Sequence, residues 1–263
     1  MRRRAFITLL GGAAVAWPLA ARAQHPTMPV VGLLTSRGPG DAPQLLAAFR
    51  QGLKDTGFVE SQNVAIEYRF AGNKNEQLPA LAADLVHRQV SVIAATTTVA
   101  ALAAKAATTA IPIVFESGGD PVRLGLVASL NRPDGNITGV TQLNVVVAPK
   151  RLEVLHELLP TATVMALLID PTDPTNAETT TRDLQAAAHA FALQLHVLNA
   201  STERDFDTAF ANLIQLRAGG LVIGPDPFFA SRSNYSPHRH SSTRGHRLRQ
   251  EDAKACSPSS SEQ

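Results

Sequence analysis

Residues 111–140, IPIVFESGGDPVRLGLVASLNRPDGNITGV, decide the fold, because their local signals for strand, turn, helix, turn and strand all agree. The apolar, β-branched run at residues 111–115 predicts a strand buried on both faces. A helix is expected at residues 121–130, and a second strand at residues 137–140. The stretch therefore predicts two parallel strands joined by a crossover helix.

The turn before this helix has its own signals. Gly118 and Gly119 let the backbone turn freely. Asp120 can cap the helix, and Pro121 fits the first helical position, where its missing N–H costs nothing. Asp120 is at least as good a candidate for a helix cap as for a ligand contact.

The rest of the chain repeats the alternation of strand and helix. Further strands are predicted at residues 30–34, 64–70, 90–93, 164–169, 195–198 and 221–223, with helical spacing of apolar residues between them. The polar alternation at residues 64–70 is typical of a half-exposed strand near a sheet edge. The pattern predicts an α/β fold with parallel sheets flanked by helices on both faces. The first block has four or five strands and the second has three, with a crossing near residues 144–149.

Three stretches carry a resemblance to a known family: FESGGDPVRLGLVASLNRPDGNITGV at residues 115–140, KRLEVLHELLP at residues 150–160 and GPDPFF at residues 224–229. Over residues 28–229 the chain resembles the solute-binding proteins of one family of bacterial ABC transporters. Asp134 departs from the family's pattern, which usually has Gly there. The resemblance implies a two-lobed fold like that of the type I periplasmic binding proteins, in which the chain normally returns to the first lobe. Here the second lobe is expected to be incomplete.

The first 23 residues have the pattern of a secretory signal peptide. Three arginines, Arg2–Arg4, precede an apolar run at residues 5–17, and small residues suited to cleavage stand at positions 21–23. The run is too short for a membrane-spanning helix, and no Cys follows the cleavage position, so neither stable membrane insertion nor a lipid anchor is expected. A twin-arginine signal and an ordinary Sec signal both fit. The expected location is the periplasm.

The composition changes after Phe229. Residues 230–263 include nine Ser, five Arg and three His, so this segment is expected to be a disordered tail that does not belong to the family pattern. Truncation or a frameshift explains the break most simply. Metal binding by the histidines and nucleic-acid binding by the arginines are disfavoured, because no complete ligand set and no interleaved aromatic residues accompany them. The expected domains are thus a signal peptide at residues 1–23, an N-terminal lobe at 24–147, a partial C-terminal lobe at 148–229 and the tail.

The positive charge of the two terminal segments masks the net negative charge of residues 24–229. The leader carries +4 and the tail +3, so the overall charge of +2 leaves −5 for residues 24–229, although the sequence pI is about 8.9. A mildly acidic body argues against nucleic acid or an anionic membrane as partner. Cys256 is the only cysteine, which excludes an intramolecular disulfide and a thiolate metal site.

Candidate ligand-binding residues follow from the predicted sheet. Ligands of open parallel sheets bind outside the carboxyl ends of the strands. Hydroxyl groups and helix N-termini there suit a carboxylate, and a buried acid suits an ammonium group, so an amino acid or similar small zwitterion is expected. The candidates are Thr35, Ser36, Thr96, Thr97, Thr98, Ser117, Asp120, Thr141, Gln142, Asn176 and Asp226, with Asp170 beside them.

Structural roles compete with ligand contact at several of these positions. Residues 96–98 can form a cap and turn, Asp170 and Asp226 stand beside prolines as turn formers do, and Asn176 suits a helix N-terminus. The histidines are scattered without ligand spacing, so no metal site is expected.

The sequence predicts a periplasmic solute-binding component of an ABC transporter, monomeric, which binds a small solute between two lobes and delivers it to a permease. No cofactor and no enzymatic activity are expected, because the nucleophile elbow, Walker loop, zinc-protease and dinucleotide motifs are missing. Three alternatives stay open: a truncated, non-functional solute-binding paralogue, a periplasmic α/β enzyme, and a sugar-responsive transcription regulator of the same two-lobed fold.

Overall fold

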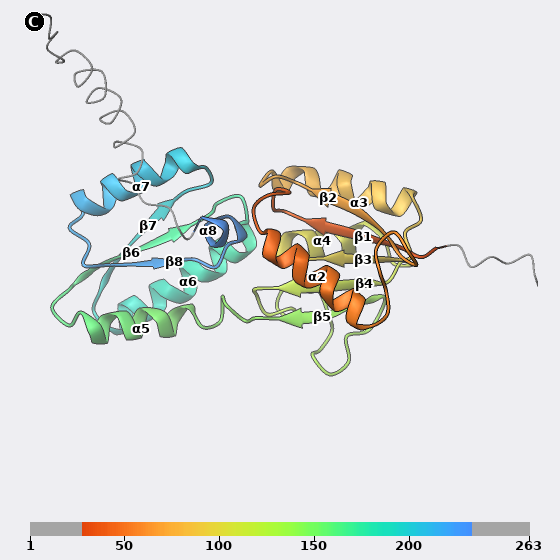
Figure 1. Cartoon of the computed structure of the whole chain (residues 1–263). Helices are drawn as coiled ribbons and strands as arrows, with labels where there is room; N and C mark the ends of the chain where they lie inside the picture. The colour runs from red at the N-terminus through yellow and green to blue at the C-terminus, as the bar shows by residue number, and fades with distance from the viewer. Residues whose placement is uncertain (1–27, 233–263) are drawn as a thin grey trace, which may run out of the picture.

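The computed structural model describes residues 28–232, which form two α/β lobes side by side (Figure 1). The predicted signal peptide and all but the first three residues of the predicted tail lie outside the described residues. Within residues 28–232, no helix has both the length and the apolar character that a membrane crossing requires.

The first lobe is built on a five-stranded sheet in the order β2-β1-β3-β4-β5, with every neighbouring pair parallel. Its strands are β1 (Val30–Thr35), β2 (Ala65–Phe70), β3 (Val92–Ala95), β4 (Ile113–Ser117) and β5 (Ile137–Thr141). All six residues of β2 are partly exposed, and β2 is an edge strand, as its alternating sequence predicted. The parallel pairing of the sheet is also confirmed.

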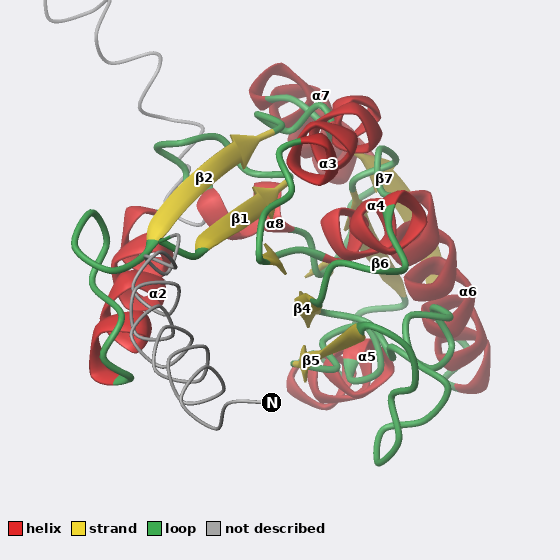
Figure 2. Cartoon of the chain, turned by 90° about the vertical axis from the view of Figure 1, so that its right-hand side faces the viewer, coloured by secondary structure: helices red, strands yellow, loops and turns green. Residues whose placement is uncertain are grey.

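Helices cover the two faces of this sheet unequally. Helices α3 (Leu78–His87) and α4 (Thr98–Ala107), with a 3₁₀ turn at Asn75–Gln77, lie on one face, and α2 (Pro43–Asp55) lies on the other (Figure 2). The main core forms under α3 and α4, where the side chains of Leu85, Ile93 and Phe115 are buried. A smaller cluster forms under α2, where Phe49 packs against Val31 and Ala94.

The prediction of a crossover helix at residues 121–130 is wrong. This segment forms turns, which still join two parallel strands. Asp120 Oδ1 accepts the N–H groups of Val122 (2.9 Å) and Arg123 (3.4 Å), as a cap would. Gly125 then takes a φ of +67°, which ends the helical course. The ammonium group of Lys105 on α4 donates to the carbonyls of Gly125 and Leu126 and fixes the turn.

The prediction that the strand at residues 111–115, which corresponds to β4, is buried on both faces is also wrong. Val114 is 48% exposed, and Val140 on the neighbouring strand is 67% exposed, although both lie inside strands. The reason is the position of α2, which covers the face near β1 and does not reach β4 and β5 in the described part of the chain (Figure 2). Strand β4 therefore has one buried face, which carries Ile113 and Phe115.

The second lobe contains the three parallel strands that the sequence predicted, in the order β7-β6-β8. They are β6 (Val164–Ile169), β7 (Gln194–Asn199) and β8 (Gly220–Ile223), and the helices are α5 (Ala148–Leu158), α6 (Pro174–Ala190), α7 (Glu203–Gln215) and α8 (Pro227–Ser231). Leu152, Leu167 and Leu184 form the core under α5 and α6, whereas Leu168 and Phe206 belong to the core under α7 and α8. The short helix α8 was not predicted, and it includes Ala230 and Ser231, which the sequence reading placed in the tail.

Gly139 and Gly52 provide a matched test of the first lobe. A Cβ at position 139 would stand 2.1 Å from the carbonyl oxygen of Phe115, whereas a Cβ at position 52, inside α2, would meet nothing within 4 Å. Gly139→Ala should lower the free energy of unfolding by about 1–3 kcal/mol, because β4 and β5 must separate. Gly52→Ala should raise it by up to about 1 kcal/mol. Urea unfolding measures both, and equal stabilities would contradict the close approach at Gly139.

Candidate functional site

A cavity of about 400 Å³ lies between the two lobes. The arrows of β1 and β5 point toward the second lobe, and those of β6 and β8 point toward the first (Figure 1). The carboxyl ends of both sheets therefore face each other, and the loops that follow the strands line the cavity. This is the position that the sequence predicted for a site.

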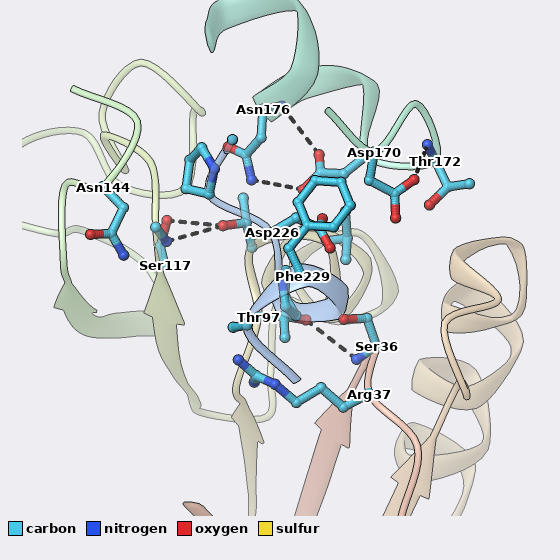
Figure 3. Close-up of a pocket in the computed structure, with 18 of the residues that line it drawn as sticks. Ser36, Arg37, Thr97, Ser117, Asn144, Asp170, Thr172, Asn176, Asp226 and Phe229 are labelled. Atoms are coloured by element: carbon cyan, nitrogen blue, oxygen red, sulfur yellow. Dashed lines mark hydrogen bonds between the residues drawn. The ribbon is translucent and has the colours of Figure 1, made fainter. Parts of the chain in front are cut away.

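Most of the candidate residues come together at this cavity. Eight of the eleven line it, namely Ser36, Thr96, Thr97, Thr98, Ser117, Gln142, Asn176 and Asp226, and Asp170 lies beside them (Figure 3). They come from both lobes, although as many as 190 positions separate Ser36 and Asp226 in the sequence. The common reason is that each follows the carboxyl end of a strand or stands at the helix start beyond it.

The three remaining candidates do not line the cavity. Thr35 accepts the N–H of Arg37 (3.3 Å) and faces α2. Asp120 caps the turn that replaces the predicted helix. The hydroxyl of Thr141 donates to the Gly119 carbonyl (2.8 Å) and is used to hold that loop. The structure gives these residues local structural roles.

Several residues that line the cavity were not among the candidates predicted from the sequence. Arg37 and Glu116 lie next to predicted candidates at strand ends, so their position alone could have identified them. Asn144 and Arg151 come from the crossing segment and α5, and Phe229 comes from the unpredicted helix α8. No local signal marked these three as cavity residues.

The wall formed by the first lobe consists of linked hydroxyl groups. Thr97 Oγ1 accepts N–H groups from Ser36 and Ala100, both at 3.4 Å, and thereby caps α4. The hydroxyls of Thr98 and Ser117 are 3.4 Å apart, and Thr98 Oγ1 also accepts the N–H of Gly118 (3.2 Å). The threonines thus act as cap and turn residues, as the structural alternative predicted, and still line the cavity.

The wall formed by the second lobe is acidic. Asp173 accepts the backbone N–H of Asn176 (3.2 Å) and its side-chain amide (2.7 Å), and so caps α6. Asp226 accepts the N–H of Phe228 (2.7 Å) and caps α8. Asp170 accepts the N–H of Thr172 (2.8 Å). The structural alternative for Asp170 and Asp226 is therefore correct, while their carboxylates also line the cavity.

Burial controls the ionisation of this wall. It raises the pKa of Asp226 to about 7, and the negative charge of Asp170 adds to the rise, whereas the Phe228 N–H and the charge of Arg37 oppose it. Burial also raises the pKa of Asp173. Across the cavity, burial lowers the pKa of Arg37, although Glu116 and Asp226 pull it upward. Near pH 7, Asp226 changes its protonation state.

Two parallel sheets that face each other across a cavity form the two-lobed α/β fold of the type I periplasmic binding proteins, which confirms the predicted fold class. The sequence pattern of the ABC transporter substrate binding protein family matches residues 42–234. The chain therefore belongs to that family, as its resemblance predicted. The family is one of substrate-binding proteins, in agreement with the expectation that the chain is not an enzyme.

A tyrosine-binding protein of Clostridioides difficile is 28% identical over 166 residues, which are 63% of this chain and 47% of that protein. This chain thus spans about half the length of that relative. Among solved structures, a conserved domain protein of Vibrio cholerae has a TM-score of 0.66 and 23% identity, with 74% of this chain and 64% of that chain covered. An ABC domain from Streptococcus pneumoniae in complex with L-Trp has a TM-score of 0.65 and 19% identity, with 78% and 68% covered.

The raised pKa of Asp226 makes stability depend on pH. The carboxyl has a pKa of about 7 when folded and 3.8 by itself, so between these values the folded protein binds more protons than the unfolded chain. The free energy of unfolding therefore falls as pH rises from about 4 to 8. Asp226→Asn retains the oxygen that caps α8 and removes this loss. At pH 8 this variant should be more stable than the native protein by about 1–3 kcal/mol. This gain in the free energy of unfolding is smaller than the full pKa shift would give, because solvent reaches the half-buried carboxyl group.

Urea unfolding at pH 4.5 and pH 8 measures this effect. The difference between Asp226→Asn and the native chain should nearly vanish at the lower pH. Asp183→Asn, at a position of α6 that does not line the cavity, serves as control and should show no such trend. A constant difference across pH would contradict the raised pKa.

Proposed function

We propose that this chain is the solute-binding component of an ABC transporter, which closes its two lobes on a small solute and delivers it to a membrane permease. The observation that carries this proposal is the cavity between the lobes, lined from both sides by polar groups at strand ends. Membership of the substrate-binding family supports it. The signal-like sequence of residues 1–23 supports export to the periplasm, by either route.

An amino acid or a similar zwitterion suits the chemistry of the two walls. The first lobe supplies the hydroxyls of residues 96–98 and the guanidinium of Arg37, which suit a carboxylate. The second lobe supplies the carboxylates of Asp170 and Asp226, which suit an ammonium group. The names of the similar proteins, which include a tyrosine-binding protein, an L-Trp complex and a leucine-binding protein of Thermotoga maritima, support this ligand class.

Within residues 28–232, few polar contacts cross between the lobes outside the cavity walls, and one of them is the ion pair of Arg123 with Asp183 (3.8 Å). Arg232, after α8, pairs with Asp41 of the first lobe (3.2 Å) and Glu203 of the second (2.7 Å). Asn75 donates to the Thr172 carbonyl (3.1 Å). Contacts between such partly exposed side chains contribute about 0–1 kcal/mol each, so the lobes can open and a bound solute can bias them toward closure.

Arg37→Met tests the solute site. It removes the guanidinium from the first-lobe wall and keeps the length of the side chain, so affinity for an amino acid should fall about 10- to 100-fold. Arg204→Met, an exposed position on α7, should leave affinity unchanged. The assay is isothermal titration calorimetry, after a thermal-shift panel of amino acids and other small solutes has identified a ligand. If no solute raises the unfolding midpoint, solute binding by this chain is excluded and the non-functional alternative stands.

Arg232→Met tests closure. Loss of the contact with Asp41 should shift the ligand-free population toward open lobes by about fivefold, which corresponds to roughly 1 kcal/mol. Distances between spin labels on α3 and α7, with Cys256 replaced by Ser, report the population. Arg88→Met breaks ion pairs inside the first lobe only and should leave the distances unchanged. A distribution in Arg232→Met identical to that of the native chain would argue against this contact as a determinant of closure.

A further inference from the structure

A second, much smaller cavity adjoins the acidic wall. Its volume is about 10 Å³, room for one group of the size of a water molecule. It shares six lining residues with the main cavity, so the two are parts of one site. The residues that line only the small cavity are Ile169, Ala177 and Thr180.

Thr180 is the unusual member of this lining. It lies on α6, is 1% exposed, and its hydroxyl oxygen has no hydrogen-bond partner within the described residues. A buried hydroxyl without a partner costs about 1–3 kcal/mol, so such groups normally have one. Since Thr180 shares the small cavity with three carboxylates, a group that donates hydrogen bonds there would satisfy them together.

The three carboxylates, those of Asp170, Asp173 and Asp226, have only neutral donors. Every hydrogen bond that they accept comes from a backbone or side-chain amide. Over residues 28–232, no Lys, Arg or His nitrogen lies within 4 Å of any of them. Arg37 acts on Asp226 only at longer range and is shared with Glu116 and Asp41.

The charge of the main cavity points in the same direction. Four acidic side chains line it, and only Arg37 and Arg151 oppose them. A neutral zwitterion would add one positive and one negative charge and leave this excess unchanged. Carboxylates that share a site disfavour each other's ionised form, and a second positive charge on the solute would relieve that repulsion.

We propose that the solute carries a net positive charge: besides an α-carboxylate and an α-ammonium group, it has a primary ammonium that enters the small cavity and donates to Thr180 Oγ1 and the carboxylates around it. A lysine-like, diamino solute has this chemistry. A metal ion is not the occupant, since no group of three His, Cys, Asp or Glu in the described chain has the spacing to hold one. This inference rests on the proposed solute-binding function.

Thr180→Val is the matched variant. Valine has the shape of threonine, and the hydroxyl that it removes has no partner within the fold, so the protein should remain folded. Thr181→Val is the control: the hydroxyl of this next residue on α6 also has no partner within residues 28–232, but it lines a different depression, next to Glu178, Arg182 and Gln185.

The experiment is calorimetric titration of the purified chain with L-lysine and with L-norleucine, which lacks the second ammonium. The native chain and Thr181→Val should bind L-lysine at least 10-fold more tightly than L-norleucine. In Thr180→Val, affinity for L-lysine should fall about 5- to 10-fold, and that for L-norleucine should not change.

Each of the other outcomes would contradict one part of the proposal. Equal affinities for both solutes in the native chain would overturn the cationic preference and leave solute binding intact. A lysine preference that Thr180→Val does not reduce would overturn the place assigned to the ammonium. If no amino acid of a wider panel binds, the proposed function itself fails, and this inference fails with it.

Discussion

The parallel direction of every strand pair is the constraint on which this molecule depends. In a parallel sheet all carboxyl ends lie at one edge, so each strand delivers its following loop to the same place. Here two such edges face each other, and residues as distant as Ser36 and Asp226 come to line one cavity. The site is thus a consequence of topology, and the side chains only determine what it can hold.

The same residues cap helices and line the cavity in this protein. Thr97, Asp173 and Asp226 begin α4, α6 and α8, and each also lines the cavity. A carboxylate at a helix N-terminus is normally stabilised by the amide hydrogens and the helix dipole. Asp226 shows which effect is larger: burial and the neighbouring Asp170 outweigh its bond to Phe228, and its pKa rises. The cap is therefore not enough to hold a full negative charge there without a positive partner.

The sequence predicted what depends on local pattern and missed what depends on partners far along the chain. The strands, their parallel pairing and the place of eight of the eleven candidate residues at the cavity followed from apolar periodicity and from loops at strand ends. The failed crossover helix depends on Lys105, which binds the carbonyls of the turn from α4. Val114 is exposed because α2 covers only the part of the sheet near β1. Arg151 and Phe229 line the cavity because of the way in which the two lobes face each other. Residues 115 and 116 show that neighbours in one strand can face a core and a cavity in turn.

The two walls differ in charge, and under the proposed function this difference would orient the solute and oppose closure in its absence. Arg37 and the hydroxyls stand on one side and the three aspartates on the other, although Glu116 shares the wall of Arg37, so a solute with separated charges would favour one orientation. The contacts between the lobes include partly exposed pairs such as Arg232 with Asp41, and a pair of this kind contributes about 0–1 kcal/mol. Under the proposed function, a solute that neutralises the acidic wall would therefore influence the open–closed balance more than a pair of this kind. A ligand shifts the balance between open and closed lobes only by the difference in its affinity for the two states. Here that difference in affinity comes from the charged groups of the two walls, which contact the solute together only when the lobes are closed.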